Sequence, residues 1–143
     1  MLRVVIAIAF AMISCHASAW SSPKEAVERF AAFDFNGGRL DSWDEYETNY
    51  TYMPDDYDEP GWDAVVVVEK FSVGEPVCSA RRCAVPVTYQ LVPTKSLNDR
   101  YAVSHESGGS EVLTFDVIEK HGVWKIDPSP IQPRVSLEIY NNF

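Results

Sequence analysis

The hydrophobic repeat of this chain changes once, and this change restricts the fold more than any other feature of the sequence. Up to about residue 50, apolar side chains recur every three to four residues, as on one face of a helix. From residue 64 onward they alternate or run continuously, as in strands. Helices followed by consecutive strands predict an α+β fold. We therefore expect N-terminal helices packed on a curved antiparallel sheet.

The first helix has a start signal and a stop signal. Ser22–Glu25 reads Ser-Pro-Lys-Glu, with a serine N-cap, a proline at the first helical position and a glutamate placed to return the capping bond. Asn36–Gly38 tolerates positive φ and should end the helix. The apolar stripe between these signals predicts one face that packs against the sheet.

A second, shorter helix is predicted after the first. Ser42 and Glu45 repeat the capping-box pattern. The helix that they predict carries three aromatic side chains, Trp43, Tyr46 and Tyr50. Because aromatic side chains serve binding surfaces as well as cores, all three are candidate binding residues.

Four segments are predicted to form strands. Residues 64–73 are rich in β-branched side chains and nearly continuous in hydrophobicity, which indicates a buried strand. Residues 83–91 and 113–117 alternate between apolar and polar side chains, which gives each segment one core face. A tight turn should then lead into a fourth strand at 123–126.

Residues 1–19 are predicted to be a secretory signal peptide. One positive charge at Arg3 precedes an apolar run at 4–13, and small residues follow up to Ala19. The run is too short for a membrane-spanning helix, so we expect cleavage after Ala19, no transmembrane segment in the mature chain, and a periplasmic or secreted protein. A lipoprotein attached at Cys15 is the alternative, because the residues before Cys15 loosely resemble a lipoprotein box.

Residues 20–143 are then expected to form a single acidic domain. The whole chain has 12 basic and 21 acidic residues and a net charge of −9, which becomes −10 when Arg3 leaves with the signal peptide. A charge of this sign repels nucleic acid and anionic membrane surfaces. It excludes those partners and leaves a basic protein, a small apolar ligand or a second copy of the chain in a homodimer.

The two cysteines of this domain are close in sequence. Cys78 and Cys83 are separated by four residues, and in an oxidising compartment we expect a disulfide between them that clamps a hairpin. Closing such a short loop stabilises the fold by roughly 2 kcal/mol. A metal or redox pair is the alternative, but the spacing is not Cys-x-x-Cys and no second Cys or His pair accompanies it. No metal and no cofactor are expected.

The stretch Asp55–Asp63, DDYDEPGWD, contains five acidic residues and no basic residue. Calcium binding is one interpretation, but the spacing of an EF-hand loop is absent. A sugar-binding rim built from Tyr52, Tyr57 and Trp62 is a second. The third, which we favour, is a solvated loop that leads into the first strand, with Trp62 closing one end of the core.

Acidic and aromatic residues are mixed over the whole range 41–63, where nine acids and six aromatics occur without Lys or Arg. If one surface of the protein recognises a partner, this segment is the best candidate. Its candidate binding residues are Trp43, Tyr46, Tyr50, Tyr57 and Trp62.

Three segments resemble exported bacterial proteins of the nuclear transport factor 2-like superfamily, namely SPKEAVERFAAFDFNGGRL at 22–40, DEPGWDAVVVV at 58–68 and GVWKID at 122–127. The resemblance covers most of residues 20–143. It implies the cone-shaped fold that the superfamily shares with ketosteroid isomerase. It does not imply one function, because this fold hosts isomerases, dehydratases, transport factors and binding modules.

The resemblance also implies which residues to inspect for catalysis. Enzymes of the superfamily enclose an apolar pocket with a carboxylate base and tyrosine or acid donors. No isomerase motif occurs here, so we expect no catalytic residue. Asp34 is expected to pair with Arg39 or to cap a turn. Asp116 lies between Phe115 and Val117, so it should face away from the core unless the register is reversed.

Three functions are consistent with these observations. The leading hypothesis is an exported, non-catalytic binding domain for a small ligand or a protein partner. The second is an enzyme of the ketosteroid isomerase type. The third is an inhibitor or immunity-type protein whose acidic face blocks a basic toxin or hydrolase.

Overall fold

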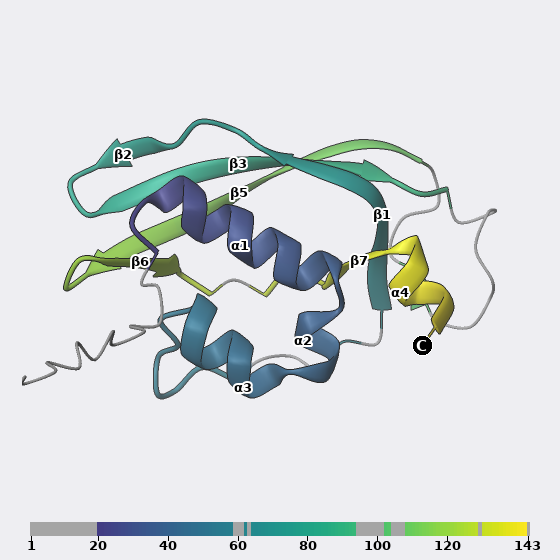
Figure 1. Cartoon of the computed structure of the whole chain (residues 1–143), viewed down its shortest axis with the longest axis horizontal. Helices are drawn as coiled ribbons and strands as arrows, with labels where there is room; N and C mark the ends of the chain where they lie inside the picture. The colour runs from purple at the N-terminus through teal and green to yellow at the C-terminus, as the bar shows by residue number, and fades with distance from the viewer. Residues whose placement is uncertain are drawn as a thin grey trace, which may run out of the picture.

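A computed structural model describes residues 20–58, 62, 64–93, 102–103, 108–128 and 130–142 of the chain. The predicted signal peptide, including Cys15, lies outside the described residues. The described chain forms a strongly curled sheet with helix α1 (Pro23–Phe35) lying along its inner side (Figure 1). The short helical segments at 38–50 lie below α1, whereas the C-terminal helix at 137–142 lies beside the strand at 64–73 (Figure 1).

The strands of this sheet are β1 (Ala64–Val73), β2 (Val77–Ser79), β3 (Arg82–Leu91), β4 (Ala102–Val103), β5 (Gly109–Lys120), β6 (Val123–Ile126) and β7 (Arg134–Ser136). Their main order is β4-β1-β3-β5-β6, with β2 beside β3 and β7 beside β1. The β1–β3, β2–β3, β3–β5 and β5–β6 pairs are antiparallel, whereas β4 and β7 run parallel to β1. The predicted α+β class, with helices on a curled and mostly antiparallel sheet, is confirmed.

The helical elements are α1 (Pro23–Phe35), α2 (Gly38–Asp41), α3 (Trp43–Glu45), the π-helical turn η1 (Tyr46–Tyr50) and α4 (Leu137–Asn142). The start of α1 is as predicted, because the Ser22 side chain accepts a hydrogen bond from the Glu25 N–H at 3.1 Å. The return bond differs, since the Glu25 carboxylate accepts from Ser21 instead of Ser22. Gly37 ends the helix with φ +83°, which favours glycine.

The predicted capping box at Ser42 is wrong. The Ser42 side chain makes no capping bond, and the Glu45 N–H donates to the Ser42 carbonyl at 3.1 Å instead. Ser42 already ends α2, because its N–H donates to the Gly38 carbonyl at 2.8 Å. The second helix expected after Ser42 is therefore two short elements, α3 and η1, and a separate short helix, α2, precedes them.

One hydrophobic core fills the space between α1 and the sheet. Its buried members are Ala26, Val27, Phe30, Tyr46, Val66, Val68, Cys83, Val85, Val87, Tyr89, Phe115, Val117 and Ile126. The members from β3 and β5 are those that the alternating pattern predicts. The alternating pattern therefore predicted the inward face of β3 and β5 correctly.

Both faces of β1 are buried at residues 66–68. Val66 and Val68 enter the core beneath α1, whereas Val67 packs with Val135 and Tyr140 on the other side. This second cluster explains why β1 has a continuous apolar run instead of an alternating one. A bulge in β1 shifts its register with β3, and bulges bend and twist a strand. The curl of the sheet brings β7 close enough to take part in the site described next.

Candidate functional site

A layer of buried charged side chains begins where α1 ends. Arg39, in α2, donates from Nε and Nη2 to Oδ1 and Oδ2 of Asp34, both at 2.9 Å. The two side chains are 1% and 2% exposed. Arg39 Nη1 also donates to the Ile131 carbonyl at 2.9 Å. The predicted pairing of Asp34 with Arg39 is confirmed, and both charges are held by hydrogen bonds inside the protein.

Arg134 brings a second guanidinium group into this layer from β7. Its backbone N–H donates to Asp34 Oδ2 at 3.0 Å, so one carboxylate connects α1, α2 and β7. Its Nη2 donates to Glu111 Oε2 at 2.8 Å, and its Nη1 donates to the Gln132 carbonyl at 2.8 Å. Its guanidinium carbon lies 5.2 Å from the centre of the Tyr89 ring. The Arg134 side chain, only 4% exposed, therefore reaches from β7 across to β5.

Two buried donors in this layer have no hydrogen-bond partner among the described residues. They are the hydroxyl of Tyr89 and the Nε–H of Arg134. Burial, and next the negative charge of Asp34, raise the pKa of the Tyr89 hydroxyl, while both arginines act in the opposite direction. Buried donors without a partner cost free energy, so an additional hydrogen-bond acceptor placed in this layer would be stabilised.

The carboxylates examined for catalysis are not placed as general bases. Asp34 is the only buried acid among the described residues, and its two oxygens accept three bonds from arginine groups. A general base must be free to take a proton from the substrate, which Asp34 is not. Asp116 lies exposed on the outer face of β5, 3.9 Å from Arg82 Nη1. The register predicted from Phe115 and Val117 is confirmed.

Three of the five predicted binding residues lie near one another. The ring centres of Trp43 and Tyr46 are 5.0 Å apart. The guanidinium carbon of Arg39 lies 5.6 Å from the Tyr46 ring centre and 6.0 Å from that of Trp62. Tyr46 is buried in the core, whereas Trp43 is 37% exposed. Tyr46 and Trp62 therefore hold Arg39 through cation–π contacts, and Trp43 presents the accessible aromatic surface.

The other two predicted binding residues have different surroundings. Tyr50 stacks on Phe33, with ring centres 4.4 Å apart, and on Trp20 at 5.9 Å. This stack packs η1 against α1, which gives Tyr50 a structural role in addition to the predicted one. Tyr57 is half-buried in a turn in which its N–H donates to the Pro54 carbonyl at 3.0 Å. The binding roles of both residues stay predictions.

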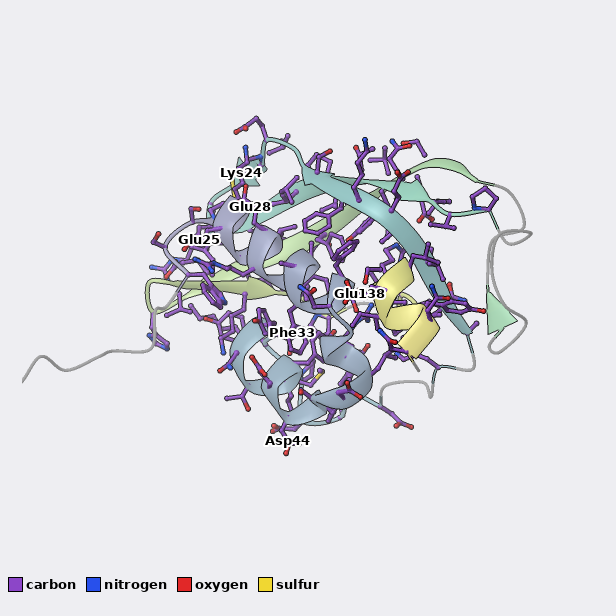
Figure 2. All side chains as sticks on the ribbon, turned by 45° about the vertical axis from the view of Figure 1, so that its right-hand side comes forward. Lys24, Glu25, Glu28, Phe33, Asp44 and Glu138 are labelled. Carbon is purple, nitrogen blue, oxygen red and sulfur yellow. A yellow bond between two sulfur atoms is a disulfide. The ribbon has the colours of Figure 1, made fainter. Side chains whose placement is uncertain are left out.

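The acidic side chains of residues 41–58 are on the surface. The exposed carboxylates are those of Asp41, Asp44, Glu45, Glu47, Asp55, Asp56 and Asp58. Figure 2 shows Asp44 pointing into solvent at the end of the molecule farthest from the sheet. Glu59 and Asp63 lie outside the described residues. We refer to the exposed side chains of residues 41–58, including Trp43, as the acidic surface.

Cys78 and Cys83 form the predicted disulfide. They are directly opposite each other in the β2–β3 pair, with Cα atoms 4.0 Å apart. Cys83 is buried in the core and Cys78 is exposed. Within the described residues β2 pairs with β3 alone, so the disulfide fastens a strand that has a single neighbour.

The sequence did not identify Arg134, Glu111 and Tyr89 as members of one site. One signal was available, because Arg134 is a charged residue in a C-terminal segment that contains several apolar residues. A buried charge in such a segment must find a partner. The partner itself could not be named, since Glu111 lies 23 residues earlier and meets Arg134 only through the curl of the sheet.

The part of the chain that the structure describes has no cluster of three or more His, Cys, Asp or Glu side chains that could hold a metal ion. Its helices are all too short or too polar to cross a membrane. Comparisons of the chain with protein-family models, with curated proteins and with solved structures found no match.

Proposed function

We propose that this protein is an exported, non-catalytic binding domain with a nuclear transport factor 2-like cone, and that its acidic surface binds a basic protein. The observation that carries this proposal is the exposure of Trp43 among exposed carboxylates. Tryptophan is enriched in the energetically dominant positions of interfaces. Charges around it would steer a partner of opposite sign.

The fold supports the cone-shaped part of this proposal. Helices come first and pack inside a curled sheet, as in the superfamily that the sequence resembles. The proposal of export rests on the signal-peptide pattern of residues 1–19. The Cys78–Cys83 disulfide agrees with export, because disulfides persist in oxidising compartments.

The state of the carboxylates supports a non-catalytic role over the isomerase-like alternative. Asp34 is held by two arginines and Asp116 is exposed beside Arg82. Proton abstraction by either one would need a desolvated carboxylate beside a substrate, with its pKa near neutrality. The inhibitor-type hypothesis is one form of the proposal, in which the basic partner is a toxin or a hydrolase.

A charge-reversal experiment tests the proposal. The probe is an octalysine peptide, and the test variant is Asp44→Lys with Glu47→Lys on the acidic surface. The control is Glu28→Lys with Glu138→Lys, which changes the net charge equally but on α1 and α4, away from Asp44 (Figure 2). We expect the test variant to weaken binding by roughly tenfold or more and the control by less than about threefold.

Trp43→Ala completes this experiment. It leaves the charge unchanged and should weaken binding to the same peptide if the indole takes part in recognition. Equal losses in the two charge-reversal variants would mean that only the total charge of the protein attracts the peptide. That result, or a Trp43→Ala variant that binds as well as the unmodified protein, would contradict a defined binding surface at residues 41–58.

A further inference from the structure

The two buried arginines use their guanidinium groups differently. Arg39 places Nε and Nη2 on the two oxygens of Asp34, the side-on geometry in which arginine binds a carboxylate most strongly. Arg134 has the same pair of donors but uses only Nη2, which donates to Glu111 Oε2 at 2.8 Å. Its Nε–H has no partner in the described part of the chain. Of the two side-on donors of Arg134, only Nη2 therefore has a partner among the described residues.

The Tyr89 side chain, which contacts Arg134, supplies a second donor without a partner within the described structure. The Tyr89 ring lies against the Arg134 guanidinium group, 5.2 Å from ring centre to guanidinium carbon. The hydroxyl is buried and finds no acceptor among the described residues. Its raised pKa keeps it protonated and able to donate throughout the physiological range. Both unused groups are donors, so the group that would satisfy them is an acceptor.

The charges decide which kind of acceptor fits. Asp34, Arg39 and Arg134 are almost completely buried and together carry one net positive charge. Glu111 balances it, but the Glu111 side chain is 24% exposed and belongs to the rim of the layer. We infer that Arg134 and Tyr89 form a binding subsite for a small carboxylate, which takes the place of Glu111 on Nη2 and adds bonds to Nε and to the tyrosine hydroxyl.

The exchange needs no additional positive charge, because the ligand carboxylate replaces that of Glu111 on Nη2. The carboxylate of Glu111 would move outward to water, and the carboxylate of the ligand would occupy the volume that it leaves. A ligand carboxylate bonded to both Nε and Nη2 gains the two-point geometry that Asp34 has with Arg39. The net negative charge of the chain opposes entry weakly, because salt screens it beyond about 8 Å. The subsite therefore suits acetate and short-chain carboxylic acids.

Acetate is the probe for the test. The Nε–H signals of Arg134 and Arg39 are followed by ¹H–¹⁵N NMR while sodium acetate is added at constant ionic strength, with sodium chloride in a parallel titration. We expect a saturable shift of the Arg134 signal with acetate and no saturation with chloride. Glu111→Gln should bind acetate about tenfold more tightly, because the competing carboxylate is gone. Tyr89→Phe should bind it about tenfold less tightly, since a hydrogen bond to a charged group is lost.

Two controls make the result interpretable. Glu119→Gln removes another carboxylate of β5, one that pairs with Arg81 at 3.3 Å, and should leave acetate binding unchanged. An unshifted Arg39 Nε–H signal shows that a variant has kept its folded interior. Absence of a saturable Arg134 shift up to about 50 mM acetate, where even millimolar affinity would saturate the site, overturns the inference. Equal affinity in the unmodified protein, Glu111→Gln and Tyr89→Phe also overturns it.

This subsite is independent of the proposed partner surface. The charge-reversal variants of Asp44 and Glu47 lie in another part of the chain and should bind acetate as the unmodified protein does. Conversely, Tyr89→Phe should bind octalysine normally. Failure of one proposal therefore leaves the other standing.

Discussion

Asp34 and Arg39 form a two-point ion pair in which both bonds measure 2.9 Å and both side chains are almost fully buried. The pair spans the break between α1 and α2, five residues apart in sequence. Asp34 also accepts the backbone N–H of Arg134 at 3.0 Å, which anchors β7 to the same point. One carboxylate thus connects the start of the fold to its end.

Asp34→Asn should destabilise the fold strongly. The amide keeps the shape of the side chain but leaves Arg39 as an uncompensated buried charge, so we expect a loss of about 3–5 kcal/mol in the free energy of unfolding. Urea unfolding followed by circular dichroism measures this loss.

Asp127→Asn is the matched control, because it breaks an ion pair of the same chemistry at the surface. Asp127 accepts from Arg82 Nη1 at 2.8 Å, with both side chains at least a third exposed. Its removal should cost less than about 1 kcal/mol. Equal costs for the two substitutions would show that burial adds nothing to the Asp34–Arg39 pair.

Replacing both Cys78 and Cys83 by serine should lower the stability by roughly 2 kcal/mol without unfolding the protein. The disulfide closes a short loop, and β2 contributes little to the core because it is an exposed three-residue strand. Urea unfolding of the variant, compared with that of the unmodified protein, measures the loss. A variant that is unfolded in the absence of urea would mean that the disulfide supports more of the fold than this hairpin.

Tyr89→Phe should change how the stability depends on pH. Burial raises the pKa of the Tyr89 hydroxyl in the folded protein, so the unfolded chain loses this proton first, at about pH 10. Below that pH the residue adds no pH dependence, and above it the folded state loses stability as the pH rises. Tyr89→Phe should therefore have a flatter stability profile between about pH 10 and 11.

The same variant should be no less stable than the unmodified protein at pH 7. It removes a buried hydroxyl that has no partner among the described residues and keeps the ring that packs against Arg134. Unfolding at a series of pH values tests both statements. A large loss at pH 7 would mean that the hydroxyl already has an acceptor in solution.

Trp43→Ala and Tyr46→Ala should affect stability very differently. Trp43 is 37% exposed, so its removal should cost about 1 kcal/mol or less. Tyr46 is buried against Phe30 and Arg39, and its truncation should cost about 3–5 kcal/mol. Thermal unfolding separates the two. A similar loss for both would assign Trp43 to the core and remove it as a test of partner binding.

Several elements could be predicted because their signals are local. The strand at 64–73 was predicted with the bounds that the structure gives β1, since a run of β-branched residues between turn residues has few alternatives. Ser22 begins α1 because its capping bond reaches only three residues ahead. The Asp34–Arg39 pair was predictable for the same reason, because the two residues are neighbours across one helix end.

The wrong capping-box prediction at Ser42 shows the limit of local sequence signals. The capping-box pattern is present, but the preceding turn already uses Ser42 to end α2. A four-residue pattern contains no information about the conformation of the residues that precede it. The same limit applies to Tyr46, which the sequence named as a candidate binding residue and which packing places in the core.

The sequence by itself determined that helices precede the main strands, the inward face of each central strand, the Cys78–Cys83 pairing and the excess of acidic charge, because these depend on periodicity, spacing and composition. Only the tertiary structure decided that Arg134 meets Glu111 and Tyr89, from three strands that are far apart in the chain. The curl of the sheet creates this meeting, since it brings β7 across to β5. A buried charge requires a partner wherever it lies, but which partner it finds depends on how the strands bend in space.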